Sequence, residues 1–378
     1  MNFSGFFYII FTERVGIGAM KRYKVGVIGA TGMVGQRFVS LIEGHPWFEL
    51  SAVAASSRSA GKTYEEAVAG RWLMGTPIPE AAKSMIVTCA QSDILAIAGE
   101  ADFVFSAVDM KKDEIRALEE AYARAECPVI SNNSAHRLTP DVPMVIPEVN
   151  PGHIGVIKHQ RSRLGTKNGF IAVKSNCSLQ SYVPAFHPLK DAFGLTRALA
   201  CTYQAVSGAG KTLSSWPEMV DNVIPYIGGE EEKSEQEPLK IWGSISGGVI
   251  VPADSIAITT QCIRVPVSDG HMAAVFVSFR GKPDIGEVKR LWREFKGRPQ
   301  ELALPSAPKQ FLRYFEEEDR PQTGLDRMLE NGMAVSLGRL RPDTQFDCKF
   351  ICLSHNTLRG AAGGAVLLAE LLCAEGFI

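Results

Sequence analysis

The stretch Tyr23-Lys-Val-Gly-Val-Ile-Gly-Ala-Thr-Gly-Met-Val-Gly35 joins a short apolar run to a turn rich in glycine. Tyr23–Ile28 has the length and composition of a buried strand, and a stretch of helical character follows from Gly32 to Glu43. Glycines at 29, 32 and 35 let the backbone approach a pyrophosphate, whose charge meets the helix N-terminus. We predict a dinucleotide site. The spacing departs from the G-x-G-x-x-G fingerprint, so a glycine-rich connection without a ligand is the alternative.

Strands and helices continue to alternate after this turn. We expect further strands at 49–55, 84–88, 101–106 and 128–131, and an amphipathic helix at 112–124. This order predicts an α/β fold, with a Rossmann-type doubly wound parallel sheet.

The composition of the chain changes after about residue 160. Segments rich in Thr, Val, Ile and Phe occur at 195–206, 255–266 and 272–280, with a helical stretch at 285–296. They predict a second, α+β domain with a mixed sheet. The last helix, 358–374, contains Gly363 and Gly364, which permit close approach to another element.

Two domains follow from this order and from the length of 378 residues. We expect an NADP-binding domain at 20–160, completed by the C-terminal helix 356–378, and a catalytic and oligomerisation domain at 161–355. Residues 1–19 hold an apolar run, 3–11, that is too short to span a bilayer and lacks a basic segment before it. We interpret them as an extension of unknown role.

Composition excludes several classes of partner. The formal net charge is -1, and no dense run of Lys or Arg suggests a nucleic-acid surface. The eight cysteines are scattered singly, without a CxxC pair or a zinc-like spacing, so we expect no metal site. Such usage fits a reduced, cytoplasmic compartment, and no membrane partner is expected.

The residues after the second strand indicate which dinucleotide binds. An NAD enzyme usually places Asp or Glu there to accept from the ribose 2′-hydroxyl. This chain has Ser56, Ser57, Arg58 and Ser59 instead, with no acid before Glu65. Hydroxyls and a guanidinium suit a 2′-phosphate, which predicts NADP. The alternative is a solvated surface arginine.

One cysteine stands in a distinctive context. The apolar run 170–173 ends at Lys174-Ser-Asn-Cys-Ser178, and an apolar-periodic stretch follows to Leu189. Ser or Asn at this boundary makes a good helix cap, which would put Cys177 in the first helical turn. The helix dipole there favours a thiolate, and free amides can hold an oxyanion. We predict that Cys177 is a nucleophile, whereas the other cysteines fit small buried hydrophobes.

A thiolate that attacks a carbonyl needs an acid or base and counter-charges for its substrate. His271 closes the segment Arg264-Val-Pro-Val-Ser-Asp-Gly-His271, whose Pro and Gly favour a fixed loop between two strands. By itself a loop histidine is more often structural.

These segments together resemble aspartate-semialdehyde dehydrogenases, particularly their archaeal and fungal branch, from about Tyr23 to the C-terminus. The motifs that carry the resemblance are GATGMVGQRF at 29–38, SNCS at 175–178, QAVSGAG at 204–210, GGEEEK at 228–233, RVPVSDGH at 264–271 and HNTLRGAAGG at 355–364.

The resemblance implies a role for each motif. Cys177 would form the thioester, His271 would be the general acid/base, and Gln204 would orient the substrate. Arg264 would bind the substrate carboxylate and Glu230 its ammonium, although three consecutive glutamates permit a register error of one. The remaining implied contacts are Arg137 and Lys233 for phosphate, and Gly29, Thr31, Gly32, Met33, Val34, Ser207, Gly208 and Asn356 for the cofactor.

The implied reaction is the NADP-dependent reductive dephosphorylation of L-aspartyl-4-phosphate to L-aspartate-4-semialdehyde, in the biosynthesis of lysine, threonine and methionine. Asn176 and the Cys177 amide would be the oxyanion donors. The family also implies a homodimer or homotetramer.

Three alternatives remain. A malonyl-CoA or succinyl-CoA reductase would share Cys177 and His271 but would have no use for Glu230, because its substrate lacks an amino group. An N-acetyl-glutamyl-phosphate reductase shares the thioester chemistry. A catalytically silent NADP-binding paralogue would have no need of the complete set of Cys177, Gln204, Arg264 and His271.

Overall fold

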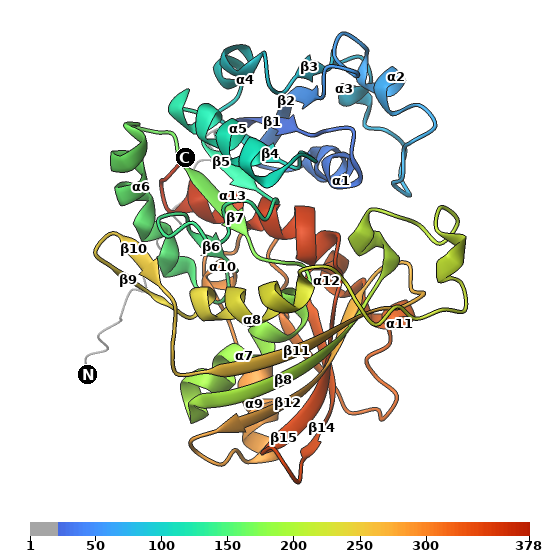
Figure 1. Cartoon of the computed structure of the whole chain (residues 1–378), viewed down its shortest axis with the longest axis vertical. Coiled ribbons are helices and arrows are strands. Elements are labelled where there is room, and N and C mark those ends of the chain that lie inside the picture. The colour runs from blue at the N-terminus through green and yellow to red at the C-terminus, as the bar shows by residue number, and fades with distance from the viewer. Residues whose placement is uncertain (1–21) are drawn as a thin grey trace, which may run out of the picture.

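Two sheets form separate layers in the computed structural model, which describes residues 22–378 (Figure 1). The expectation for residues 1–19 lies outside this range. The first sheet has seven parallel strands in the order β3-β2-β1-β4-β5-β7-β6. Its strands are β1 (Tyr23–Ile28), β2 (Phe48–Ala55), β3 (Thr88–Cys89), β4 (Phe103–Ser106), β5 (Val129–Ser131), β6 (Met144–Val145) and β7 (Ile171–Lys174). The predicted doubly wound α/β sheet is confirmed.

Helices connect these strands. They are α1 (Met33–Ile42), α2 (Tyr64–Val68), α3 (Glu80–Lys83), α4 (Ile94–Glu100), α5 (Lys112–Arg124), the 3₁₀ helix η1 (Pro151–Val156) and α6 (Ile157–Leu164). The strand predicted at 84–88 is wrong in extent, since only Thr88 and the following Cys89 pair with β2. Ile86 is 56% exposed and joins Thr63 in an isolated bridge, because this segment runs along the edge of the sheet.

β7 follows residue 160, where the composition changes, yet it pairs with β5 and β6 in the first sheet. The division of the chain at 160 stays a prediction.

The pairing of β7 with β5 also decides where Cys177 lies. The carboxyl ends of parallel strands share one edge of a sheet, so the turn that carries Cys177 emerges at the same edge as the glycine turn after β1.

The second sheet is mixed, as predicted, with the order β11-β8-β12-β15-β14-β13. Its strands are β8 (Leu195–Gln204), β11 (Ala257–Arg264), β12 (His271–Phe279), β13 (Leu312–Phe315), β14 (Val335–Pro342) and β15 (Cys348–Ser354). α7 (Leu179–Phe193) and α9 (Ile285–Glu294) pack against it. Phe186 and Trp292, one from each helix, contact Phe350 of β15, and all three are buried. Burial of such aromatic side chains dominates the energetics of a core.

Shorter elements complete the chain. They are η2 (Val206–Ala209), η3 (Pro217–Met219), α8 (Glu230–Ile241), the hairpin of β9 (Ser244–Ser246) and β10 (Val249–Val251), α10 (Arg298–Glu301), α11 (Thr323–Asp326), α12 (Leu329–Gly332), the π-helical η4 (Leu358–Ala362) and α13 (Gly363–Ala374). Across residues 22–378, no helix has the length and apolar character needed to cross a membrane.

α13 lies between the two sheets (Figure 1) and is buried along almost its whole length. A Cβ at Gly363 would lie 2.8 Å from Met333 Sδ, and one at Gly364 would lie 3.4 Å from Lys174 Cδ. The close approach expected of these glycines is confirmed. Arg359, just before α13, donates to Glu148 Oε1 at 2.6 Å, and neither side chain is exposed. This buried pair ties the C-terminal segment to the loop after β6.

Candidate active site

The register of the second sheet brings three predicted side chains together. β8 and β11 run parallel, and their last residues, Gln204 and Arg264, are directly paired. β12 runs antiparallel beside β8 and starts at His271, at the same edge. Gln204 therefore meets Arg264 and His271, which follow it by 60 and 67 positions, because strand pairing places all three at one edge.

Cys177 lies in the turn between β7 and α7. The Oδ1 of Asn176 accepts from the amide of Ser178 at 2.7 Å and from its hydroxyl at 2.8 Å. These bonds form an Asx turn just before α7. The expected side-chain cap is wrong, because the N-cap residue is Ser178 and it makes no side-chain capping hydrogen bond. The prediction that Cys177 stands in the first helical turn is wrong by a small margin, since the helix begins at Leu179. A Cβ at Gly360 would lie 2.9 Å from Cys177 Cβ, so only glycine leaves room there.

The thiol of Cys177 faces a cavity of about 280 Å³. Enclosure by protein, followed by the negative charge of Glu230, raises the pKa of Cys177. Lys174, Arg137 and Arg264 oppose this shift, in that order. The expected thiolate therefore depends on these cations as well as on the helix dipole.

Glu230 lines the same cavity at the start of α8. Its carboxylate accepts from Lys233 Nζ at 2.7 Å, from Asn176 Nδ2 at 3.0 Å and from Gln204 Nε2 at 3.4 Å. Burial alone would raise the pKa of Glu230, but Lys233 and Asn176 lower it. Glu231 points elsewhere, towards Gln261 and Cys262 on β11. The structure places Glu230, not Glu231, beside the thiol.

The contacts of Asn176 bear on its expected role as an oxyanion donor. Its Nδ2 is within 3.0 Å of both oxygens of Glu230, and its backbone amide donates to Glu237. The side-chain amide is thus already engaged by a carboxylate. Its role towards an oxyanion stays a prediction.

His271 is fully buried at the start of β12. Its Nδ1 accepts from the Ala205 amide at 3.1 Å, which places the proton of a neutral imidazole on Nε2. Nε2 has no protein partner among the described residues. Burial, followed by the charge of Arg264, lowers the pKa of His271 to about 3. The imidazole is therefore neutral, with an N–H at Nε2 that no described protein group accepts.

This pKa predicts a loss of stability in acid. The unfolded chain takes up a proton at His271 below its ordinary pKa of 6.5, whereas the folded chain does not until about 3. The unfolding free energy should therefore fall as the pH drops from 6.5, by about 2 kcal/mol from this residue at pH 5. Urea unfolding of His271→Gln between pH 7 and 5 should show a smaller loss than the wild type.

His159 provides the matched control, because it is exposed. His159→Gln should keep the wild-type pH dependence. Equal losses in His271→Gln and the wild type would contradict the assignment of a neutral buried imidazole.

Gly208 separates Arg264 and His271 from the cavity that it lines. A Cβ on Gly208 would lie 2.9 Å from both Arg264 Nη1 and His271 Nε2. Any larger residue at position 208 would therefore collide with these two nitrogens. Arg264 Nη1 also donates to Ala205 O at 2.7 Å, which fixes the guanidinium.

The predicted cofactor contacts Ser207 and Asn356 line the same cavity as Val34 and Cys177. Asn356 Nδ2 donates to Ser207 Oγ at 2.8 Å, and its Oδ1 accepts from the Gly270 amide at 2.8 Å. Asn356, just after β15, thus links the loop that carries Ser207 to the loop that precedes His271.

The glycine turn after β1 has the predicted geometry. Gly29 has φ +85°, and a Cβ there would lie 2.3 Å from Ala107 O. Gly32 caps α1 without a side-chain hydrogen bond, and it is exposed. The first amides of α1, which follow Thr31, therefore lack a side-chain cap and fit an anion.

The loop after β2 also fits the predicted cofactor. Ser56, Ser57 and Arg58 are exposed, and the Ser59 amide donates to Ser56 O at 2.9 Å. Ser59 itself is buried, so its hydroxyl is the least available of the four. Exposed hydroxyls and a guanidinium at the end of β2 suit a 2′-phosphate.

Sequence reasoning missed several residues around these cavities. Arg37 and Lys211 line a second cavity of about 260 Å³, together with Met33 and Ser207. Arg37 Nε is buried without a protein partner in the described part of the chain. Arg37 follows Met33 by four positions, about one helical turn, so it lies on the same face of α1 and could have been predicted from the helical spacing. Asn132, Asn133 and Ser134, which line the Cys177 cavity, follow β5 and carried no such signal.

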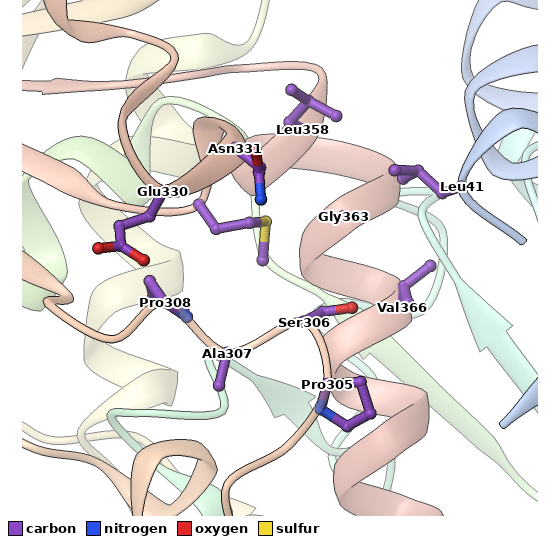
Figure 2. A pocket seen from close by; sticks show the side chains of 11 residues that line it. Leu41, Pro305, Ser306, Ala307, Pro308, Glu330, Asn331, Leu358, Gly363 and Val366 are labelled. Carbon is purple, nitrogen blue, oxygen red and sulfur yellow. The ribbon is translucent and has the colours of Figure 1, made fainter. Parts of the chain in front are cut away.

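A further cavity, of about 320 Å³, lies beside α13. Figure 2 shows Leu41 and Val366 on one side of it and Glu330 and Asn331 on the other. Its lining includes one carboxylate but no cation and no thiol among the described residues. The Cys177 cavity, and not this one, therefore has the groups that a nucleophilic site requires.

Comparison with known proteins agrees with this geometry. A family model described as semialdehyde dehydrogenase, NAD binding domain, matches residues 24–157, and one described as semialdehyde dehydrogenase, dimerisation domain, matches residues 186–359. Aspartate-semialdehyde dehydrogenase from Methanothermobacter thermautotrophicus is 44% identical over 350 residues, which cover 92% of this chain and 98% of the relative. The chain belongs to the aspartate-semialdehyde dehydrogenase family. The Aspergillus fumigatus member is 42% identical, over 94% of this chain and 98% of its own length.

Solved structures of the family have the same fold. The aspartate-semialdehyde dehydrogenase of Candida albicans, solved with NADP, matches with a TM-score of 0.85 and 39% identity, over 95% of this chain and 100% of that one. Aspartate-semialdehyde dehydrogenase II of Vibrio cholerae, solved with ASA, matches with a TM-score of 0.72 and 26% identity, over 94% and 99%. The resemblance seen in the short motifs thus extends over nearly the whole chain.

Proposed function

We propose that this enzyme converts L-aspartyl-4-phosphate, NADPH and a proton to L-aspartate-4-semialdehyde, phosphate and NADP, through a thioester on Cys177. The observation that carries the proposal is the arrangement of four groups around one cavity. Cys177 and Glu230 line it, and Arg264 and His271 lie directly behind Gly208 in its wall. A nucleophile, an anion, a cation and a proton donor are what this substrate and reaction require.

Arg264 and Glu230 carry charges opposite to those of the carboxylate and the ammonium of an amino acid. Arg264 offers a fixed guanidinium to the substrate carboxylate, and Glu230 offers an ionised carboxylate to the ammonium. Gln204, which lies between them at the end of β8, orients the substrate. Arg137 and Lys233 also line the cavity and are proposed to bind the phosphate.

The residues of the chain carry out the acyl transfer and the proton movement. Cys177 Sγ attacks the acyl carbon, the bond to phosphate breaks, and a thioester remains. NADPH, when bound, supplies the hydride that reduces this carbonyl carbon. The oxyanion that results takes a hydrogen bond from His271 Nε2–H, and its collapse breaks the C–S bond and releases the aldehyde. Lys174, Arg137 and Arg264 stabilise the sulfur anion that is regenerated.

NADP specificity is proposed to come from Arg58. Replacing Arg58 by Ala removes a charge-assisted hydrogen bond to the 2′-phosphate, an effect on the order of 1.5–3 kcal/mol. The KM for NADPH should therefore rise about tenfold or more, while that for NADH changes little. Steady-state kinetics with both cofactors measure this. If the KM values for NADPH and NADH rise together, Arg58 has a structural role and another group recognises the 2′-phosphate.

The wider setting is proposed from the family. The first domain, with the C-terminal helix, would bind NADP, and the second would carry most catalytic groups and the contacts of a homodimer or homotetramer. A cytoplasmic location fits the free cysteines, because no disulfide occurs among the described residues.

A direct assay tests the function. Purified enzyme should oxidise aspartate semialdehyde in the presence of phosphate and NADP, and NAD should support a lower rate. Malonyl-CoA with NADPH is the matched alternative substrate. Efficient reduction of malonyl-CoA without turnover of aspartate semialdehyde would replace this proposal by a CoA-thioester reductase.

A further inference from the structure

One face of α8 is buried against the site. Glu230, Lys233, Glu237 and Lys240 recur at intervals of three and four, which places them on the same side of the helix. Glu230 and Lys233 belong to the proposed substrate site. Glu237 and Lys240 are each only 2% exposed, and the proposed reaction assigns them no role.

Glu237 joins two segments that are distant in sequence. Its Oε1 accepts from Arg137 Nη1 at 3.1 Å, and its Oε2 accepts from the backbone amide of Asn176 at 2.6 Å. Asn176 directly precedes Cys177, and both segments line the cavity. One buried carboxylate therefore sets the position of the nucleophile turn relative to Arg137.

The guanidinium of Arg137 makes three hydrogen bonds within the protein. Besides Glu237, its Nε donates to Lys174 O at 3.0 Å and its Nη2 donates to Asn132 O at 3.2 Å. Three of its five N–H groups are so used, and two are left for an anion in the cavity. The orientation of those two groups depends on the three internal bonds.

Lys240 fixes the same segment from the next turn of α8. Its Nζ donates to the carbonyl oxygens of Arg137, Thr139 and Val142 at 2.7, 2.7 and 2.8 Å. A lysine ammonium has three donors, and all three are used. The main chain at Arg137 and its side chain are thus both anchored to α8.

We propose that Glu237 is a positioning residue that holds Arg137 for phosphate and the Asn176–Cys177 turn for attack. This rests on the proposed function, in which Arg137 binds phosphate. Phosphate affinity and thiol reactivity then depend on Glu237, although it touches neither the phosphate nor the sulfur.

A double-mutant cycle tests the effect on phosphate. Glu237→Gln keeps one acceptor oxygen but loses the charge and the second acceptor. It should raise the KM for phosphate by about tenfold, while the KM for aspartate semialdehyde changes by less than about threefold. Arg137→Met should raise the phosphate KM at least as much, and the double variant no further. Additive effects in the cycle would overturn the proposal.

Further variants separate positioning from general damage. Glu237→Asp retains the charge but is shorter by one methylene, so its phosphate KM should lie between those of the wild type and Glu237→Gln. Glu232→Gln is the control, because Glu232 is on the same helix but exposed, and it should behave as the wild type. Equal changes in both KM values in the Glu237 variants would indicate a purely structural role and overturn the proposal.

Alkylation of Cys177, which does not require turnover, tests the positioning role of Glu237 separately from the proposed function. The rate of Cys177 alkylation by iodoacetamide should differ from that of the wild type in Glu237→Gln and not in Glu232→Gln. If the wild-type enzyme shows no phosphate-dependent turnover, the proposed function fails, and the alkylation rates then decide whether Glu237 positions the thiol. Wild-type alkylation in Glu237→Gln would refute that.

Discussion

Cys177→Ser is expected to lower kcat by at least about a thousandfold while leaving the affinity for NADPH nearly unchanged. A serine hydroxyl is a far weaker nucleophile than a thiolate, and the cations that stabilise sulfur cannot ionise it at neutral pH. The loop after β2, which is proposed to bind the 2′-phosphate, does not line the cavity that Cys177 faces, and Val34 of the glycine turn does. Turnover with aspartate semialdehyde and phosphate, and fluorescence titration with NADPH, measure the two quantities.

A second cysteine serves as the control for this prediction. Cys89 is a partly buried thiol on the edge strand β3, and it does not line the Cys177 cavity. Cys89→Ser should keep the wild-type rate within about twofold. Retention of more than a few per cent of the rate in Cys177→Ser would show that another group forms the covalent bond.

The first sheet was predictable because its signals are local. An apolar run, glycines at fixed spacing and a helical period identify β1, the turn and α1 within twenty residues, Tyr23–Ile42. The strand predicted at 84–88 was wrong in extent because the signal that decides it is not local. Ser84–Val87 has the composition of a strand, but whether it pairs depends on its position at the edge of the sheet, and composition does not report this.

The site was predictable only in part. Cys177 has a local signal in the polar turn before α7. Gln204, Arg264 and His271 meet through the register of β8, β11 and β12, and their roles were implied only by resemblance to a family. Glu237 carried no signal at all. In the polar run that begins α8, a single glutamate looks like part of a solvated face, and only tertiary structure shows that it is buried.

Glu230→Ala is expected to reduce kcat/KM for aspartate semialdehyde by about a hundredfold to a thousandfold, because an ammonium left unpaired in a closed site costs several kcal/mol. Arg264→Ala should impair both aspartate semialdehyde and malonyl-CoA, since each carries a distal carboxylate. The two variants, each assayed on both substrates, separate recognition of the amino group from recognition of the carboxylate.

Glu231→Ala is the matched control, since Glu231 bonds to β11 and not to the cavity. It should retain most of the activity. A loss in Glu231→Ala in place of Glu230→Ala would preserve the function and move the ammonium site by one residue. If the wild-type enzyme reduces malonyl-CoA efficiently and Glu230→Ala changes neither reaction, the substrate has no amino group. The carboxylate beside Cys177 would then serve only to hold Lys233 and Asn176 in place.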